Sequence, residues 1–143
     1  MEQGLFDRAK KYDCSILNDP NVGVIKDEKG WTPLHHIAKQ GHLYVLIHPY
    51  AAIARDNNLD TPLHIMAKSG IVEVLYNPHS CIVRNKDGMT PLHMLGIVGV
   101  GEIIFNIRSY EIKDNMGKTP IDYYNEYKEN NTKNKHIPPL TEE

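Results

Sequence analysis

Apolar side chains along this chain recur at helical spacing in short stretches separated by turn-forming residues. In the middle of the chain, Leu63, Met66 and Ala67 mark one face of a helix. Thr61 before this face is a good N-cap, and Gly70 after it can end a helix in the left-handed conformation. The pattern therefore predicts a helix of about ten residues between them.

A second apolar stretch at 71–76 predicts a helix of barely two turns, because Pro78 cannot continue a helix interior. The partly β-branched residues at 81–83 predict an extended segment. Asn-Lys-Asp-Gly at 85–88 predicts a type I turn, which favours Asn at its first position and Gly at its fourth. One structural unit is thus a helix, a shorter helix and a turn.

The same unit repeats through the chain with a period of 29 residues. Its most regular feature is Thr-Pro-Leu-His or a variant of it at 32–35, 61–64, 90–93 and 119–122. We divide the chain into copies with the approximate bounds 1–29, 30–58, 59–87, 88–116 and 117–128, of which the first and last are degenerate caps. A unit this small buries too little apolar surface to fold alone, so the copies are expected to stack into one domain over 1–128.

The Thr-Pro-Leu-His signature and the Asp-x-x-Gly turn resemble the ankyrin repeat over roughly residues 3–128. The resemblance implies an all-α, ankyrin-repeat solenoid of about five helix–turn–helix repeats with β-turn hairpin loops. Ankyrin repeats usually have about 33 residues, so about one helical turn is missing, and the spacing places the loss in the second helix and its loop. We expect the large side chains Ile37, Met66, Leu95 and Tyr124 to fill the volume that the shortened helix leaves.

Two departures from the repeat concern glycine. Gly96, Gly99 and Gly101 weaken the first helix of the fourth copy, so 94–101 is expected to be the softest segment or else a place of close approach by a partner. Leu59 stands where the other turns have glycine, which predicts a different turn type there.

Composition narrows the classes of function. The 143 residues carry a formal net charge of -2 with both signs scattered, which predicts no nucleic-acid binding. No apolar run reaches the roughly 20 residues that span a bilayer, so no membrane contact is predicted. Cys14 and Cys81 lack a CxxC partner and, with no signal peptide expected, predict free thiols in the cytoplasm. The polar residues 129–143 predict a disordered C-terminal tail.

Histidine is the most prominent candidate for chemistry, because His35, His64 and His93 form a regular series. The ankyrin resemblance implies a structural role, in which each imidazole ties neighbouring hairpins by hydrogen bonds. One histidine per copy cannot close around zinc, since stacked helices lie about 8–10 Å apart and zinc bonds are about 2 Å long. A histidine-based enzyme or metal protein is therefore the third hypothesis, and no catalytic residue, metal site or cofactor is predicted.

A basic column precedes the turns and consists of Lys26, Arg55, Arg84 and Lys113. One interpretation is a stripe that grips an acidic partner surface. The favoured interpretation is a structural consensus in which the acidic residue that follows most of these bases neutralises them.

Candidate partner-binding residues occupy positions that vary between copies beside the regular frame. The ankyrin resemblance implies the hairpin tips and the exposed side of each first helix. The candidates are Glu28, Lys29, Trp31, Asn57, Asn58, Asp60, Lys86, Asp87 and Met89 at the tips, His36, Lys39, Ile65 and Lys68 on the first helices, and Arg55 and Arg84 before the turns. Trp31 and Met89 are of the type that anchors an interface, and their alternative is packing against the adjacent tip.

These observations predict a protein-binding module that works without a cofactor as a cytoplasmic adaptor, decoy or inhibitor. Short repeats in a small chain are a feature we expect of a viral or microbial protein that acts on a host factor in the host cytoplasm. The alternative is a self-assembling structural component that forms a homo-oligomer. The repeat pattern leaves open whether the concave face, the tips or the outer loops make the contact.

Overall fold

The computed structural model describes residues 2–134, and all regular structure in that range is helical. The α-helices are α1 (Glu2–Lys10), α2 (Pro33–Lys39), α3 (Pro62–Lys68), α4 (Pro91–Ile97) and α5 (Pro120–Asn134). The 3₁₀ helices are η1 (Cys14–Asn18), η2 (Leu43–Ile47), η3 (Pro49–Ala52), η4 (Val72–Tyr76), η5 (Pro78–Cys81), η6 (Gly101–Phe105) and η7 (Ile107–Tyr110).

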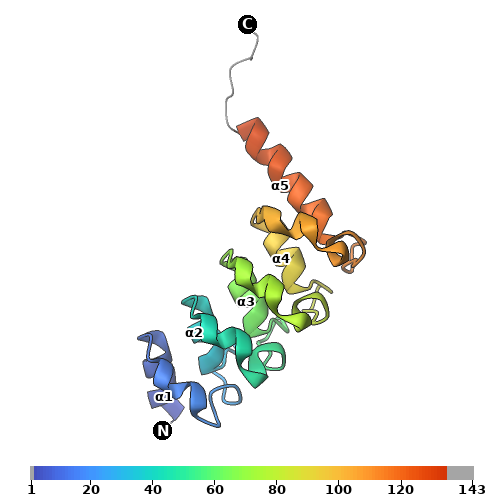
Figure 1. The fold of residues 1–143 in the computed structure, drawn as a ribbon. Coiled ribbons are helices and arrows are strands. Elements are labelled where there is room, and N and C mark those ends of the chain that lie inside the picture. The colour runs from blue at the N-terminus through green and yellow to red at the C-terminus, as the bar shows by residue number, and fades with distance from the viewer. Residues whose placement is uncertain (1, 135–143) are drawn as a thin grey trace, which may run out of the picture.

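The α-helices follow one another in chain order from one end of the molecule to the other, and α5 extends beyond the row (Figure 1). Each α-helix packs against the next one along the chain. The helices α2 to α5 begin at Pro33, Pro62, Pro91 and Pro120, so the 29-residue period of the sequence is also the period of the helices.

The helices α2, α3 and α4 begin with the same capping box and are each seven residues long. The N-cap threonine accepts a hydrogen bond from the backbone N–H of the histidine three residues later, whose ring accepts one from the threonine N–H. Just beyond these helices the chain adopts a left-handed conformation at Gly41, Gly70 and Gly99. Tyr12 takes the same conformation after α1, at φ 68°, so the first copy keeps the geometry without the glycine.

The second apolar stretch of each full copy forms one short 3₁₀ helix, as the sequence predicted, and a second 3₁₀ helix that was not predicted follows it. In the third copy, Asn77 separates η4 from η5 with an extended backbone at φ −88° and ψ 124°. Its side-chain oxygen accepts a hydrogen bond of 2.8 Å from the His79 N–H and so caps η5. Pro78 therefore begins a helix, and Cys81, which was expected to be extended, belongs to that helix.

The capping side chain, and not the proline, is common to these joints. Asn106 separates η6 from η7 in the same way and accepts a 2.9 Å hydrogen bond from the Arg108 N–H. Ile107 follows it where the earlier copies have proline. The asparagine cap therefore suffices to separate the two 3₁₀ helices.

One hydrophobic core runs through the copies from Leu5 to Ile112. Ile37, Met66 and Leu95 are almost fully buried within it, which confirms their predicted burial. Tyr124 is partly buried and packs against the same core.

The glycines of the fourth copy allow α5 to approach α4 closely. A Cβ atom at Gly96 would collide with the carbonyl oxygen of Pro120, and one at Gly99 would collide with the Tyr127 ring. The segment 94–101 is thus approached by the chain itself.

The helix α5 continues to Asn134, so residues 129–134 are helical where the sequence predicted the start of a disordered tail. Tyr124 and Tyr127 hold the first half of the helix against the fourth copy. Residues 135–143 of the predicted tail lie outside the described residues.

All four turns share one backbone conformation, which shows that the predicted change of turn type at Leu59 is wrong. Gly30, Gly88 and Gly117 have φ values of 79°, 77° and 82°, and Leu59 has a φ of 62°. The leucine therefore carries the steric strain of the left-handed region, where a Cβ atom crowds the backbone.

Replacing Gly96 by alanine should lower the free energy of unfolding by about 1–3 kcal/mol, because the new methyl group meets the Pro120 backbone. Helix propensity alone predicts the opposite sign, a gain of about 1 kcal/mol. Urea denaturation of Gly96→Ala beside the wild type decides between them. A stabilised variant would contradict the close packing of α5.

Replacing Leu59 by glycine should raise the free energy of unfolding by about 1 kcal/mol, since glycine adopts a positive φ without strain. Leu59→Ala is the matched control, because it shortens the side chain but keeps the strain. Thermal and urea denaturation should place the alanine variant at or below the wild type. Equal stability of the two variants would argue against backbone strain at this turn.

Candidate functional site

A series of histidines connects the second copy to the third, the third to the fourth and the fourth to the fifth. The Nε2 atoms of His35, His64 and His93 lie 2.8, 2.8 and 2.9 Å from the carbonyl oxygens of Asp60, Met89 and Lys118. Because a carbonyl only accepts, each Nε2 carries the hydrogen, and each Nδ1 accepts from the backbone N–H of the capping threonine. These are the bonds between neighbouring hairpins that a structural role requires.

The three imidazoles are buried, and burial lowers their pKa values. For His64, loss of solvation lowers the pKa to about 4, although the bond to Met89 and the charge of Asp60 oppose the shift. Each ring is therefore neutral near pH 7, the state in which one nitrogen donates and the other accepts.

The last copy keeps the helix cap without the cross-link. Asp122 replaces the histidine and accepts a 2.9 Å hydrogen bond from the Thr119 N–H, while the Thr119 hydroxyl oxygen accepts one of 3.2 Å from the Asp122 N–H. The helix α5 continues to Asn134, through positions equivalent to those of η6 in the fourth copy.

A second polar series forms the turns and consists of Asp27, Asp56, Asn85 and Asp114. The Oδ1 atom of each accepts hydrogen bonds of 2.9–3.0 Å from the backbone N–H groups two and four residues later. Burial opposes ionisation of Asp27 and Asp114, but side-chain hydrogen bonds from His36 and Tyr123, followed by these backbone bonds, lower the pKa of each carboxylate. The carboxylates thus stabilise the turn backbone.

The basic column has a role that neither interpretation of the sequence anticipated. Arg55 donates from one guanidinium nitrogen to the carbonyls of Leu59, at 2.9 Å, and of Arg84, at 2.7 Å. Arg84 repeats the pattern with Gly88 and Lys113, both at 2.7 Å. Each arginine therefore joins its own turn to the backbone 29 residues later.

Several predicted contact residues belong to this internal framework. Trp31 is partly buried, and its indole N–H donates to a carboxylate oxygen of Asp56 at 2.9 Å. Met89 is also partly buried and packs against the core. Asp60 and Ile65 are buried, which corrects their assignment to an exposed contact surface.

Asp60 is buried because it joins two successive turns. Its carboxylate accepts hydrogen bonds of 2.6 Å from Lys68 and 2.9 Å from Asn85. His36 is likewise partly buried, 2.9 Å from the Asp27 carboxylate and edge-on to the Trp31 ring. These side chains hold adjacent turns together.

The remaining tip candidates are exposed and lie in one row. They are Glu28, Lys29, Asn57, Asn58, Lys86 and Asp87, with Lys39 and Lys68 exposed on the helices. Backbone hydrogen bonds join successive tips, from Asn57 to Lys29 at 3.4 Å and from Lys86 to Asn58 at 2.9 Å. The turns thus present a polar surface, and backbone hydrogen bonds hold successive turns together.

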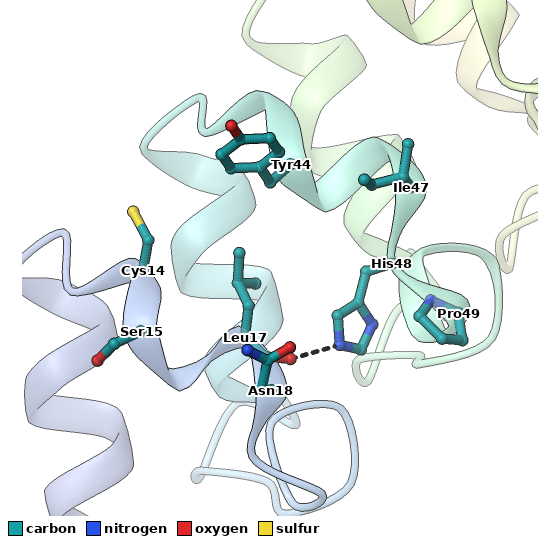
Figure 2. Close-up of a pocket in the computed structure, with 8 residues that line it drawn as sticks. All are labelled: Cys14, Ser15, Leu17, Asn18, Tyr44, Ile47, His48 and Pro49. Atoms are coloured by element: carbon teal, nitrogen blue, oxygen red, sulfur yellow. Dashed lines mark hydrogen bonds between the residues drawn. The ribbon is translucent and has the colours of Figure 1, made fainter.

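A hollow of about 500 Å³ lies between η1 and η2, on the side of the molecule formed by the 3₁₀ helices (Figure 2). Its lining includes Leu17, Tyr44 and Ile47. His48 borders it and donates a 3.0 Å hydrogen bond from Nε2 to the Leu17 carbonyl, drawn as a dashed line in Figure 2. Asn77 makes the equivalent bond to the Leu46 carbonyl one copy later, at 2.7 Å.

An equivalent hollow of about 450 Å³ lies between η4 and η6. It is lined by Leu75, Tyr76, Glu102, Phe105, Asn106 and Ile107. Each of these residues follows a residue lining the first hollow by two periods, as 75 − 17 = 58 illustrates. The two hollows are therefore the same feature of the repeat, two copies apart.

Beside the hollows stand three large apolar side chains that sequence reasoning missed. Ile47, Tyr76 and Phe105, here called the outer column, are the last residues of η2, η4 and η6 and are 80%, 81% and 85% exposed. Their 29-residue spacing was visible in the sequence. Their exposure was not, because each lies in an apolar stretch whose inward face depends on the helix type.

Over residues 2–134, no three His, Cys, Asp or Glu side chains are grouped so as to hold a metal ion. No helix in that range is both long and apolar enough to cross a membrane.

Comparison with known proteins adds no relative to this picture. No protein-family model matches the chain, and a search of curated proteins finds no match either.

The free energy of unfolding should fall as the pH is lowered from about 6.5 towards 4. The pKa of His64 is about 4 in the folded chain and 6.5 when solvated, so the unfolded chain binds this proton first. Linkage makes the contribution of His64 complete above pH 6.5 and about 3 kcal/mol smaller below pH 4. Urea denaturation at several pH values measures the slope.

The variant His64→Gln should reduce the slope of the free energy of unfolding against pH by the contribution of one proton, because an amide does not titrate in this range. His79→Gln, at an exposed position, is the control and should retain the wild-type slope. An unchanged slope in His64→Gln would contradict the assignment of a buried neutral imidazole.

Proposed function

We propose that this chain is a protein-binding module and that its contact surface includes the outer column. The observation that carries the proposal is the exposure of Ile47, Tyr76 and Phe105 by 80% or more. Contiguous exposed apolar side chains mark interaction sites on globular proteins, because burying them on binding is favourable. Hollows border this column in two places, so side chains of a partner can enter the surface.

We further infer that the repeats are of the ankyrin type. The Thr-Pro-Leu-His signature, the helix that begins at its proline and the histidine bond to the next turn support this inference. Within residues 2–134, the five α-helices contact one another in chain order, which agrees with a solenoid. Ankyrin solenoids are binding scaffolds, so this inference and the exposed column point in the same direction.

The polar residues of the repeat favour binding over catalysis. His35, His64 and His93, the most regular candidates for chemistry, donate to backbone carbonyls and are buried. Arg55 and Arg84 bond to backbone carbonyls in the same way. These side chains stabilise the stack of repeats, and a stable stack can present a contact surface.

The exposed tip row is a second candidate for contact, and the two surfaces can act together in an adaptor, decoy or inhibitor. Lys29, Asn58, Lys86 and Asp87 are polar side chains on turns joined by backbone bonds. They fit the polar rim of an interface better than its centre, which apolar anchors usually occupy. The outer column therefore ranks first.

The alternative is a homo-oligomer that buries the outer column between copies of the chain. Light scattering of the wild type separates the two functions, because a protein that binds a different partner remains a monomer. A wild-type oligomer that becomes monomeric in Tyr76→Ser, Phe105→Ser would establish the alternative.

For the binding function, the experiment is affinity capture from cell lysate followed by mass spectrometry, with three variants beside the wild type. Tyr76→Ser, Phe105→Ser should lose the captured protein. Met116→Ser removes an 80% exposed apolar side chain from a tip and should retain it. Lys29→Ser, Lys86→Ser tests the tip row. Retention by the outer-column variant together with loss by the tip variant would contradict the assignment of the surface.

A further inference from the structure

We propose that the outer column and its two hollows bind an amphipathic α-helix of the partner, with apolar side chains seven residues apart and basic residues beside them. This inference rests on the proposed binding function and names the class of partner. It follows from the repeat spacing of the surface, from the shape of the hollows and from the charges at their edge.

The spacing of the outer column matches a helix. Ile47, Tyr76 and Phe105 occupy the same position in successive copies, and helices packed side by side lie about 8–10 Å apart. Seven residues of an α-helix rise about 10.5 Å and return to nearly the same face. The same face of a β-strand recurs about every 6.8 Å, so an extended peptide falls out of register within one copy.

The hollows supply sites for the apolar side chains of such a helix. One lies between η1 and η2 beside Ile47, and the other lies between η4 and η6 beside Tyr76 and Phe105. They are two copies apart, a distance of about 20 Å on the same packing estimate, which equals about 14 residues of helix. A single helix can therefore fill both hollows with residues 14 apart while its middle turns contact the column.

Acidic side chains beside the column favour a basic partner. Glu102 lines the second hollow and is exposed, and Glu73 is its equivalent one copy earlier. Within residues 2–134, neither carboxylate belongs to an ion pair. Lysine or arginine on the flank of the partner helix would pair with both, which raises the association rate and selects against acidic helices.

The probe for this proposal is a fluorescent amphipathic peptide of about 21 residues, with leucine seven residues apart and lysine on one flank. Two matched peptides serve as controls. The first has the same composition but places leucine at alternate positions. The second keeps the leucine pattern and has glutamate in place of lysine. Fluorescence anisotropy measures binding, and circular dichroism reports the helix content of the bound peptide.

The helical basic peptide should bind the full chain and gain helix content, and the other two peptides should bind at least about tenfold more weakly. Tyr76→Ser, Phe105→Ser should weaken binding by about tenfold or more, whereas Met116→Ser should match the wild type. Glu73→Gln, Glu102→Gln should weaken binding and reduce its dependence on salt. Circular dichroism and urea denaturation of each variant check that it is folded.

Three results would overturn the proposal: no binding of the helical basic peptide, equal binding of the alternating peptide, or equal binding by the outer-column variant. A wild type that self-associates through the column would also overturn it, because a second copy then occupies the surface. If lysate capture still depends on Tyr76 and Phe105 while the peptide fails, the binding function stands and only the helical partner is excluded.

Discussion

The structure depends on a neutral imidazole that bonds in two directions. Within its own copy, the Nδ1 atom of His64 accepts from the Thr61 N–H and completes the cap of α3. Towards the next copy, its Nε2 atom donates to the carbonyl of Met89. One side chain thus satisfies backbone groups at a helix start and in the following turn, both of which are costly to bury unpaired.

The other polar residues of the repeat extend the same principle. Asp56 accepts from its own turn and from Trp31 of the preceding turn, and Arg55 donates to a carbonyl of its own turn and to the carbonyl of Arg84, just before the next turn. On the side of the 3₁₀ helices, His48 and Asn77 cap a helix and bond to the preceding copy. Because backbone groups are satisfied by neighbours one period away, short helices that would be marginal alone are held in place.

The short 3₁₀ helices explain why large apolar side chains are exposed on this side of the molecule. Val45 and Val74 point into the core from the 3₁₀ helices, and Ile47 and Tyr76, two residues later, point to solvent. With the chain divided after these residues by a capping side chain, no further helical turn covers them. The division of the chain at this point therefore leaves large apolar side chains exposed.

The sequence by itself determined the period, the helix starts at the Thr-Pro pairs, the turn positions and the burial of Ile37, Met66 and Leu95, because these follow from local capping, backbone preference and volume. It also indicated the structural character of His35, through the resemblance. Only the tertiary structure decided that Trp31 and Asp60 are drawn inward, since their partners Asp56 and Asn85 lie 25 residues away, in the next turn. It also decided that Gly96 receives α5 and that Phe105 faces solvent. The exposure of a side chain depends on which elements pack against it. The local sequence of a short apolar helix therefore does not show which of its side chains face solvent.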